Sequence, residues 1–319
     1  MEPVLKVVDL RKSFSVDGGA VHAVNGVSFE LQPGEAIGLV GESGCGKTTV
    51  ARCILRLLEP DSGEIYFEGQ SVTGQPERSF RRVRQRLQMV FQDPTMSLNP
   101  RLTVRQTISE PLFLHGLERG HALQERLYKI LGLVGLESEH LDKRPHQLSA
   151  GQKQRVGIAR AIATNPECVV LDEPTSSLDM SVKAHIVQLL RHLRETLGVA
   201  YIFISHDLST VRYLCSRILV MYQGWIIEAG QVEEVFSRPR HPYTKALISA
   251  IPVPQVGVTR ERVRLTGEVT SVQTDRGCIL QPRCPFALER CAVEDQPLRD
   301  LGDGHLAACW RAEELAAGR

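Results

Sequence analysis

The sequence has no run of about 18–20 uninterrupted apolar residues, the length that a membrane-spanning helix needs. Its first six residues carry no basic head followed by an apolar stretch, so we predict no secretory signal there. Internal repeats and low-complexity tracts are missing too. We therefore expect a cytosolic globular protein that reaches a membrane only through a partner.

An excess of one charge is also missing, because 38 basic residues face 37 acidic ones, for a net charge of +1. This balance gives no global attraction to nucleic acid or to an anionic membrane. Arginines cluster between residues 78 and 86. The cluster is short, so we interpret it as the exposed face of a helix and expect no nucleic-acid partner.

Cys-x-x-Cys pairs are absent among the eight cysteines, which argues against a zinc ribbon. Four cysteines lie scattered in apolar or helical stretches and are expected to be free thiols: Cys45, Cys53, Cys168 and Cys215. The other four cluster near the end, with five, six and seventeen residues between them: Cys278, Cys284, Cys291 and Cys309. In a cytosolic protein, such a cluster is more often a metal or cluster site than a set of disulfides. An iron–sulfur cluster, zinc and free thiols all stay open.

Apolar strands alternate with helical patterns from residue 1 to about 236. This order predicts an α/β fold with a mostly parallel sheet covered on both faces. Gln223-Gly224 separates two apolar stretches and predicts a hairpin. Strands are expected at residues 4–10, 36–40, 64–67, 168–171, 199–204 and 218–221, and helices at about 47–58, 152–164, 180–197 and 208–215.

Two segments depart from this alternation. Residues 93–147 are mainly helical in pattern, including 122–133, and predict a helical insertion between sheet strands. Residues 253–319 are rich in Pro, Gly, Cys and Arg and predict a small, loop-rich appendage. Such a region has little core of its own and needs a crosslink or a bound metal for stability. We divide the chain into a nucleotide-binding domain, residues 1–236, and a C-terminal domain, residues 237–319.

A glycine-rich segment follows an apolar strand and opens a helix, as the P-loop pattern requires. Its glycines permit backbone conformations that turn successive N–H groups inward around an anion, and the helix N-terminus adds partial positive charge. Lys47 should reach the β- and γ-phosphates, and the Thr48 hydroxyl should ligate Mg²⁺. The expected phosphate-binding residues are Gly41, Glu42, Ser43, Gly44, Cys45, Gly46, Lys47, Thr48 and Thr49.

The apolar strand at residues 168–171 ends in two carboxylates, Asp172 and Glu173. We expect Asp172 to hold Mg²⁺, directly or through water, and Glu173 to orient and deprotonate the attacking water. Considered without the rest of the sequence, two adjacent carboxylates could equally belong to a surface turn. The P-loop upstream favours the catalytic interpretation.

Residues 148–152 precede a basic helix, with Ser149 as a good N-cap and Gly151 allowing close backbone approach. By themselves they fit an ordinary capped helix as well as a phosphate site. Together, however, the motifs of residues 4–236 resemble the ATP-binding subunits of ABC transporters. Residues 148–152 match the signature that distinguishes this family, with Ala150 where a second glycine is usual. The resemblance implies a P-loop NTPase core with a helical subdomain and an antiparallel β-subdomain.

The same resemblance implies roles for further residues. Gln92 matches the glutamine that links Mg²⁺ to the membrane partner, and His206 matches the switch histidine that contacts the γ-phosphate. Phe14 stands where the family places an aromatic that stacks on adenine, with a core position as the alternative. Two such subunits meet head to tail around two ATP molecules. The residues expected to complete the partner's site, or to lie at this interface, are Ser149, Gly151, Gln152 and Asp179.

The tail narrows the resemblance to oligopeptide and dipeptide importers. Residues 241–252 are similar to the segment that follows the ATPase core in that subfamily, and residues 277–309 are similar to its cysteine region, which holds an iron–sulfur cluster in some members. Residues 91–101 and 154–160 resemble the second of the two paired ATPase subunits.

This resemblance implies an ATPase at the cytoplasmic face of the inner membrane, using ATP and Mg²⁺. Its expected partners are a paralogous ATPase subunit, two transmembrane permeases and a separate solute-binding protein. Peptides are the expected solute, with nickel, glutathione or sugar importers as alternatives. A soluble ABC ATPase acting on nucleic acid or ribosomes, or a non-hydrolysing subunit, are the remaining alternatives, and Glu173 with His206 argues against the last.

Overall fold

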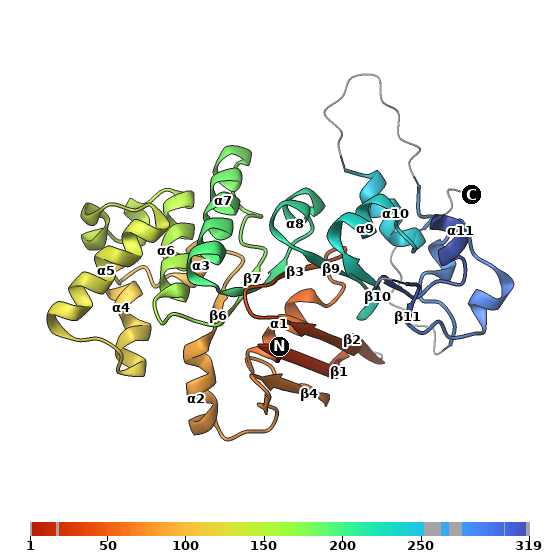
Figure 1. The fold of residues 1–319 in the computed structure, drawn as a ribbon, viewed down its shortest axis with the longest axis horizontal. Helices are drawn as coiled ribbons and strands as arrows, with labels where there is room; N and C mark the ends of the chain where they lie inside the picture. Colours follow the sequence, from red (N-terminus) through yellow and green to blue (C-terminus); the bar gives the residue numbers. More distant parts are fainter. Residues whose placement is uncertain (1, 17–18, 252–262, 268–275, 303, 317–319) are drawn as a thin grey trace.

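An eight-stranded sheet forms the centre of the computed structural model, which describes residues 2–16, 19–251, 263–267, 276–302 and 304–316 (Figure 1). The strand order is β11-β12-β10-β9-β3-β8-β7-β6. Five neighbouring strands, β9, β3, β8, β7 and β6, run parallel. The strand bounds are β3 Ala36–Val40, β6 Leu87–Val90, β7 Cys168–Asp172, β8 Ala200–Ile204, β9 Arg217–Tyr222, β10 Trp225–Gln231, β11 Arg299–Asp300 and β12 Leu306–Ala307.

Continuous apolar sequence explains the central strands, because β3, β7 and β8 are buried along their whole length. Helices α7 and α8 lie on one face of this sheet in Figure 1, and α1 lies on the other. The predicted α/β class is therefore confirmed. The covering helices are α1 Lys47–Ile54, α6 Ala150–Ile162, α7 Met180–Leu197 and α8 Leu208–Leu214.

The predicted hairpin joins β9 to β10, with Tyr222 paired to Trp225. Its two turn residues, Gln223 at φ 43° and Gly224 at φ 89°, both adopt the left-handed conformation. Two-residue hairpins favour this geometry because its twist matches that of the strands.

A second, antiparallel sheet in the order β2-β1-β4-β5 packs below α1, as the resemblance implied (Figure 1). Side chains of α1, among them Val50 and Ile54, share one buried cluster with both sheets. Strand β2 was not predicted from the sequence. Its first residues are exposed and polar or small, so the two-residue apolar alternation is weak there. The bounds are β1 Leu5–Val16, β2 Gly19–Leu31, β4 Ser62–Phe67 and β5 Gln70–Ser71.

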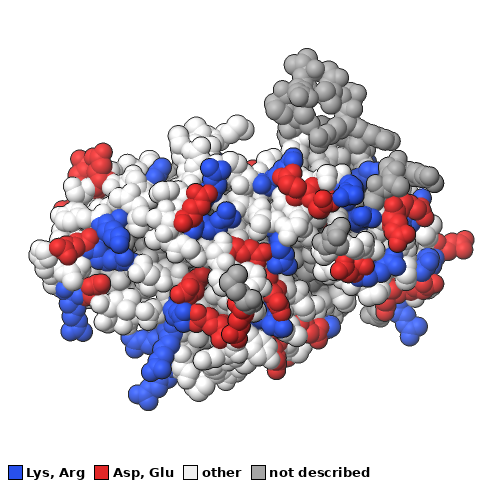
Figure 2. All heavy atoms as spheres, viewed as in Figure 1, with Lys and Arg blue, Asp and Glu red and all other residues white. Residues whose placement is uncertain are grey.

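The predicted helical insertion lies between β6 and β7 and is confirmed as a subdomain at one end of the molecule (Figure 1). It comprises α3 Pro94–Ser97, α4 Val104–His115, α5 Gly120–Val134 and two 3₁₀ turns, η1 Ser138–Asp142 and η2 Pro145–Gln147. The arginine cluster falls on α2, Glu77–Arg86, where Phe80 alone is buried. Figure 2 shows acidic and basic side chains interspersed over the visible face.

The C-terminal region continues the central sheet. Strand β12 pairs antiparallel with β10, the strand that closes the core. Glu228 of β10 is fully buried, and its Oε1 lies 2.7 Å from His305 Nε2 of the C-terminal region. The same carboxylate accepts the backbone N–H groups of Arg240, at 2.7 Å, and His241, at 2.9 Å. These contacts join the two predicted domains at a buried charged group.

The remaining elements of this region are short. They are α9 Val232–Ser237, α10 Pro242–Ser249, η3 Gln281–Arg283, η4 Glu289–Ala292 and α11 Ala312–Ala316. Across the described parts of the chain, no helix has both the length and the apolar character to cross a membrane.

Candidate active site

The loop between β3 and α1 has a backbone that only glycine tolerates at Gly46. This residue has φ 109°, and an added Cβ would lie 2.0 Å from the carbonyl oxygen of Ala23. Gly44, at φ 80°, faces open space. The loop is therefore both tightly seated and open on one side, which is the shape that an anion-binding nest requires.

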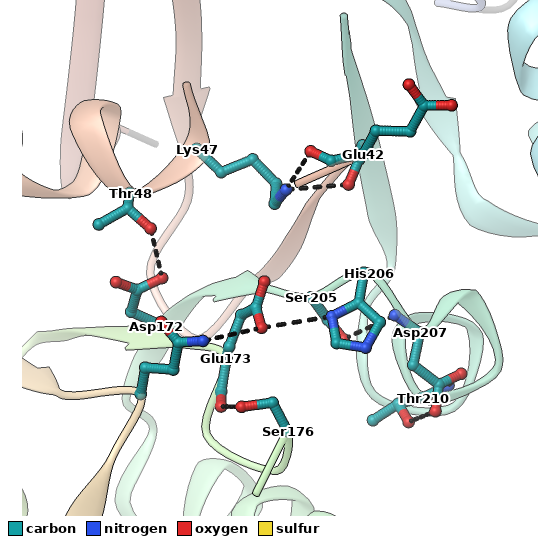
Figure 3. A network of polar contacts seen from close by, with 12 residues as sticks. Glu42, Lys47, Thr48, Asp172, Glu173, Ser176, Ser205, His206, Asp207 and Thr210 are labelled. Atoms are coloured by element: carbon teal, nitrogen blue, oxygen red, sulfur yellow. Dashed lines mark hydrogen bonds and ion pairs between the residues drawn. The ribbon is translucent and has the colours of Figure 1, made fainter. Parts of the chain in front are cut away.

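Lys47 begins α1, and its side chain is buried against this loop. Its Nζ donates to the carbonyl oxygens of Gly41 and Glu42, both at 2.9 Å (Figure 3). Carbonyl dipoles thus hold the ammonium group at the base of the loop. The arrangement fixes a positive charge where phosphate oxygens would arrive.

The Thr48 hydroxyl donates a 3.1 Å hydrogen bond to Asp172 Oδ1 at the end of β7 (Figure 3). Burial raises the pKa of Asp172, and the hydrogen bond from Thr48 opposes that effect. A hydroxyl and a carboxylate side by side form the hard oxygen donor set that Mg²⁺ prefers. The two residues thus fit such an ion.

Glu173 directs its carboxylate between two polar groups. Its Oε2 lies 3.3 Å from Gln92 Nε2 and 3.3 Å from His206 Nδ1. The residue adopts φ 44°, in the left-handed region that glutamate seldom visits, and its N–H donates to the Ile204 carbonyl at 3.0 Å. Strain of this kind is concentrated at functional sites.

Lys47, Thr48, Gln92, Glu173 and His206 line one cavity of about 470 Å³, and Asp172 lies outside its lining. The cavity brings together predicted residues from four segments of the chain, and it adds Ala23 of β2, which the sequence did not indicate. Its lining is Ala23, Ser43, Gly44, Gly46, Lys47, Thr48, Thr49, Gln92, Glu173 and His206.

The signature residues lie outside this lining. Ser149 caps α6, with its Oγ accepting the Gln152 N–H at 3.2 Å and Gln152 Oε1 accepting the Ser149 N–H at 2.9 Å. Asp179 is the N-cap position of α7. A Cβ at Gly151 would lie 2.7 Å from Val182 of α7, so glycine allows the two helices to approach closely.

Phe14 lies on β1 and is 40% exposed. The alternative prediction, that Phe14 packs in the core, is therefore wrong. Lys12 Nζ lies 5.9 Å from the ring centroid, so the exposed ring has a cation beside it.

A second cavity, of about 400 Å³, lies between the central sheet and the helical subdomain. Phe91, next to Gln92 in the chain, lines it, and so do Leu57 and Leu114. Leu57 and Leu114 are 54% and 58% exposed. The groove thus presents apolar side chains to solvent beside the glutamine of the active site.

None of the eight cysteines forms a disulfide in this structure, and the four scattered ones are all buried. The four clustered cysteines line one cavity of about 10 Å³, which holds about one water molecule. Burial raises the pKa of Cys278 to about 11 and that of Cys309 to about 12. Within the described ranges, no three His, Cys, Asp or Glu side chains form a group that could hold a single metal ion. A zinc ion therefore does not fit these four residues as they stand.

Two residues that the sequence did not mark as functional contact the P-loop. Tyr243 Oη accepts the N–H of Glu42 at 2.8 Å, and Arg283 donates to Glu42 Oε2 at 3.2 Å. The motif that contains Tyr243 was noticed only as part of the resemblance. Nothing in the local sequence around Arg283 indicates a partner 241 positions earlier.

Comparison with family models gives two matches. Residues 24–176 match the model described as ABC transporter, and residues 227–291 match the model described as oligopeptide/dipeptide transporter, C-terminal region. The two matched ranges contain the P-loop, the paired carboxylates and the first three clustered cysteines.

Full-length relatives give the same picture. The chain is 42% identical to the oligopeptide transport ATP-binding protein AppF of Bacillus subtilis, over 97% of each chain. It is 40% identical to the dipeptide transport ATP-binding protein DppF of Haemophilus influenzae, over 98% of this chain and 97% of that one. Among solved structures, cbiO1 of Clostridium perfringens, part of the ABC transporter complex cbiONQ, matches with a TM-score of 0.66 and 31% identity. That match covers 74% of this chain and 92% of the other.

Proposed function

Since the chain belongs to the ATP-binding subunits of ABC transporters, in the group with an oligopeptide/dipeptide C-terminal region, we propose that it hydrolyses ATP to energise peptide import across the cytoplasmic membrane. One observation carries the hydrolytic part of this proposal. A single cavity holds the phosphate-binding loop together with Gln92, Glu173 and His206.

The P-loop would bind the β- and γ-phosphates through its inward N–H groups, and Lys47 would donate to a phosphate oxygen while keeping its hydrogen bonds to the loop carbonyls. Thr48 and Asp172, with Gln92 nearby, would hold Mg²⁺. When bound, the ion would supply positive charge that stabilises the negative charge developing on the transferred phosphoryl group.

Glu173 would act as the general base. Its Oε2 would accept a proton from a water molecule as the water oxygen attacks the γ-phosphorus and the bond to the ADP oxygen breaks. Gln92 and His206, both 3.3 Å from that oxygen, would orient the carboxylate and the γ-phosphate. The exposed ring of Phe14 would stack on adenine.

A second ATPase subunit would complete the site. Ser149, Gly151 and Gln152 lie at the start of α6 and outside the cavity that contains the P-loop, so they are available to the nucleotide of a partner chain. The N-terminus of α6 favours a phosphate by its dipole. Asp179 at the start of α7 would lie at the same interface. We propose a paralogue as this partner.

The permease subunits would dock in the groove lined by Leu57, Phe91 and Leu114. Its exposed apolar side chains offer area for an inserted helix, and Phe91 adjoins Gln92 in the chain. Docking there would link the membrane partner to the hydrolytic site. The subunit would therefore work at the cytoplasmic face of the inner membrane, with a separate protein delivering the peptide.

We further propose that Cys278, Cys284, Cys291 and Cys309 hold an iron–sulfur cluster that staples the C-terminal region. Four thiols facing one cavity are a suitable donor set, and the Arg311 side chain on the cavity wall would offset part of the negative charge of four thiolates. The residues that line this cavity must move apart to admit the iron–sulfur cluster, because the cavity has room for only about one water molecule. Anaerobic purification followed by iron, sulfide and zinc analysis tests this, and absence of all three contradicts it.

The transport function is tested by purifying the chain with its membrane complex and reconstituting it in lipid vesicles. We expect peptide uptake that needs ATP and is lost with Lys47→Ala. Hydrolysis without any associated permease would contradict the transport function. Identification of nickel, glutathione or a sugar as the accumulated solute would contradict the peptide assignment alone.

A further inference from the structure

Glu42, the second residue of the P-loop, is held at both its backbone and its side chain by the C-terminal region. Its N–H donates to Tyr243 Oη at 2.8 Å, and its carboxylate accepts from Arg283 at 3.2 Å. The two partners come 201 and 241 positions later in the chain. Neither of them lines the cavity that contains the P-loop.

Both partners are themselves fixed. Tyr243 is fully buried near the start of α10, and its ring packs against Tyr222 with centroids 4.7 Å apart. Arg283 also donates to the Tyr222 hydroxyl at 3.3 Å, and its carbonyl accepts the Thr266 N–H at 3.1 Å. Glu42 is therefore anchored to side chains that have little freedom to move.

Glu42 is connected directly to the phosphate-binding lysine, because its carbonyl oxygen accepts from Lys47 Nζ at 2.9 Å. The preceding residue is also tightly seated, since a Cβ at Gly41 would lie 2.1 Å from the Met221 carbonyl oxygen. A displacement of Glu42 would consequently move a carbonyl that holds the Lys47 ammonium group.

The ion pair between Arg283 and Glu42 is partly shielded from solvent, so it can hold the Glu42 side chain in place. The Arg283 side chain is 13% exposed and that of Glu42 is 32% exposed, so water screens the pair less than it screens a surface pair. The Tyr243 hydroxyl, in turn, accepts an N–H at the edge of the loop, which fixes the direction of that peptide group.

We propose that Tyr243 and Arg283 are positioning residues for ATP hydrolysis, which act through Glu42 to hold the P-loop and Lys47 in their working geometry. This inference rests on the proposed ATPase function. It gives the C-terminal region a part in the reaction besides its place in the sheet.

The test compares Arg283→Met, Arg283→Lys and Tyr243→Phe with the wild-type chain in the reconstituted transporter. We expect Arg283→Met to lower kcat/KM for ATP by about tenfold, because a hydrogen bond to a charged group is lost. Arg283→Lys should recover part of that loss, because it keeps the charge. Tyr243→Phe, which removes only the acceptor, should raise KM or lower kcat without shifting the thermal midpoint by more than a few degrees.

A double-mutant cycle identifies the path of the effect. If Arg283 acts through Glu42, then Arg283→Met should have little further effect in a Glu42→Gln background. Equal effects of Arg283→Met in both backgrounds would overturn the proposal. So would a lowered thermal midpoint with unchanged kinetics, which is the mark of a purely structural contact.

Arg238→Met serves as the matched control, since Arg238 pairs with Glu234 at 2.6 Å rather than with the P-loop. We expect its kcat/KM to equal that of the wild type. A loss as large as that of Arg283→Met would overturn the proposal. Absence of ATP hydrolysis in the wild-type transporter would instead contradict the proposed function, so the two failures are distinguishable.

Discussion

The imidazole Nδ1 of His206 lies 3.3 Å from Oε2 of Glu173 (Figure 3). Nε2 of Gln92 lies 3.3 Å from the same oxygen. The strand end of β7 supplies the carboxylate, and the loop after β8 supplies the imidazole. Neighbouring parallel strands thus bring the two groups together at one edge of the sheet. Glu173, the proposed general base, and His206, the proposed contact to the γ-phosphate, therefore interact directly.

Glu173→Gln should abolish turnover while ATP binding persists. The amide cannot accept a proton from water, although it fills the same space. General-base removal costs about 10²–10⁴-fold, so we expect kcat to fall at least about hundredfold. Steady-state hydrolysis and equilibrium binding of a fluorescent ATP analogue provide the two readings. Loss of binding equal to the loss of turnover would show that the role is misassigned.

Lys47→Ala should weaken nucleotide binding itself, because the charge beneath the loop disappears. Hydrogen bonds to a charged group are worth about 1.5–3 kcal/mol, so we expect ATP affinity to fall about ten- to hundredfold. Titration calorimetry measures the change. Lys47→Arg keeps the positive charge but changes the shape of the group that carries it. Its ATP affinity should therefore lie between those of the wild type and Lys47→Ala. Unchanged affinity of Lys47→Ala would contradict the assignment.

Leu57→Glu combined with Leu114→Glu should prevent assembly with the permease subunits. Both side chains line the apolar groove, and a buried unpaired carboxylate is costly at an interface. Co-purification with the tagged permease measures assembly. Tyr128→Glu is the control and should assemble normally, because Tyr128 is an exposed residue of α5 in the same subdomain and lies outside the groove lining. Crosslinks that map the membrane contact solely to the C-terminal region would contradict the docking site.

His241 should make the fold sensitive to acid. It is fully buried, and burial lowers its pKa from 6.5 to about 3. Between those pH values the unfolded chain binds a proton that the folded chain does not, so stability falls as pH falls. The contribution is about 1.4 kcal/mol per pH unit below 6.5.

His241→Asn should remove this term while keeping a side-chain acceptor for the Tyr243 N–H, which His241 Nδ1 accepts at 3.2 Å. Urea unfolding at pH 7.5 and pH 5.5 measures the difference. We expect the wild type to lose about 1.4 kcal/mol more than the variant between these conditions. Equal losses in both chains would contradict the prediction.

Much of the fold could be predicted because its signals are local. The buried strands at residues 36–40 and 168–171 are continuous apolar runs, and glycines with Lys47 define the P-loop within nine residues. Strand β6, Leu87–Val90, was missed because Gln88 interrupts its short apolar run. The assigned chemical roles, and the boundary at residue 236, stay predictions.

Contacts between distant segments could not be predicted. The pairing of β12 with β10 involves two residues on each strand, and no composition or spacing encodes that register. The same holds for Arg283, whose partner in the P-loop is known only once the chain is folded. The four clustered cysteines were predicted to belong together, and they do line one cavity, but spacing alone did not fix its size.

The contact between Arg283 and Glu42 also has a consequence for protein synthesis. The two residues are 241 positions apart, and a ribosome adds about 5–20 residues per second, so Glu42 is made roughly 12–48 s before its partner. During that interval, the nascent chain already carries its glycines and Lys47 but lacks the arginine that binds the Glu42 carboxylate. A chain that is terminated before Arg283 never forms this contact. Translation must therefore continue past Arg283 before the Glu42 carboxylate has its partner.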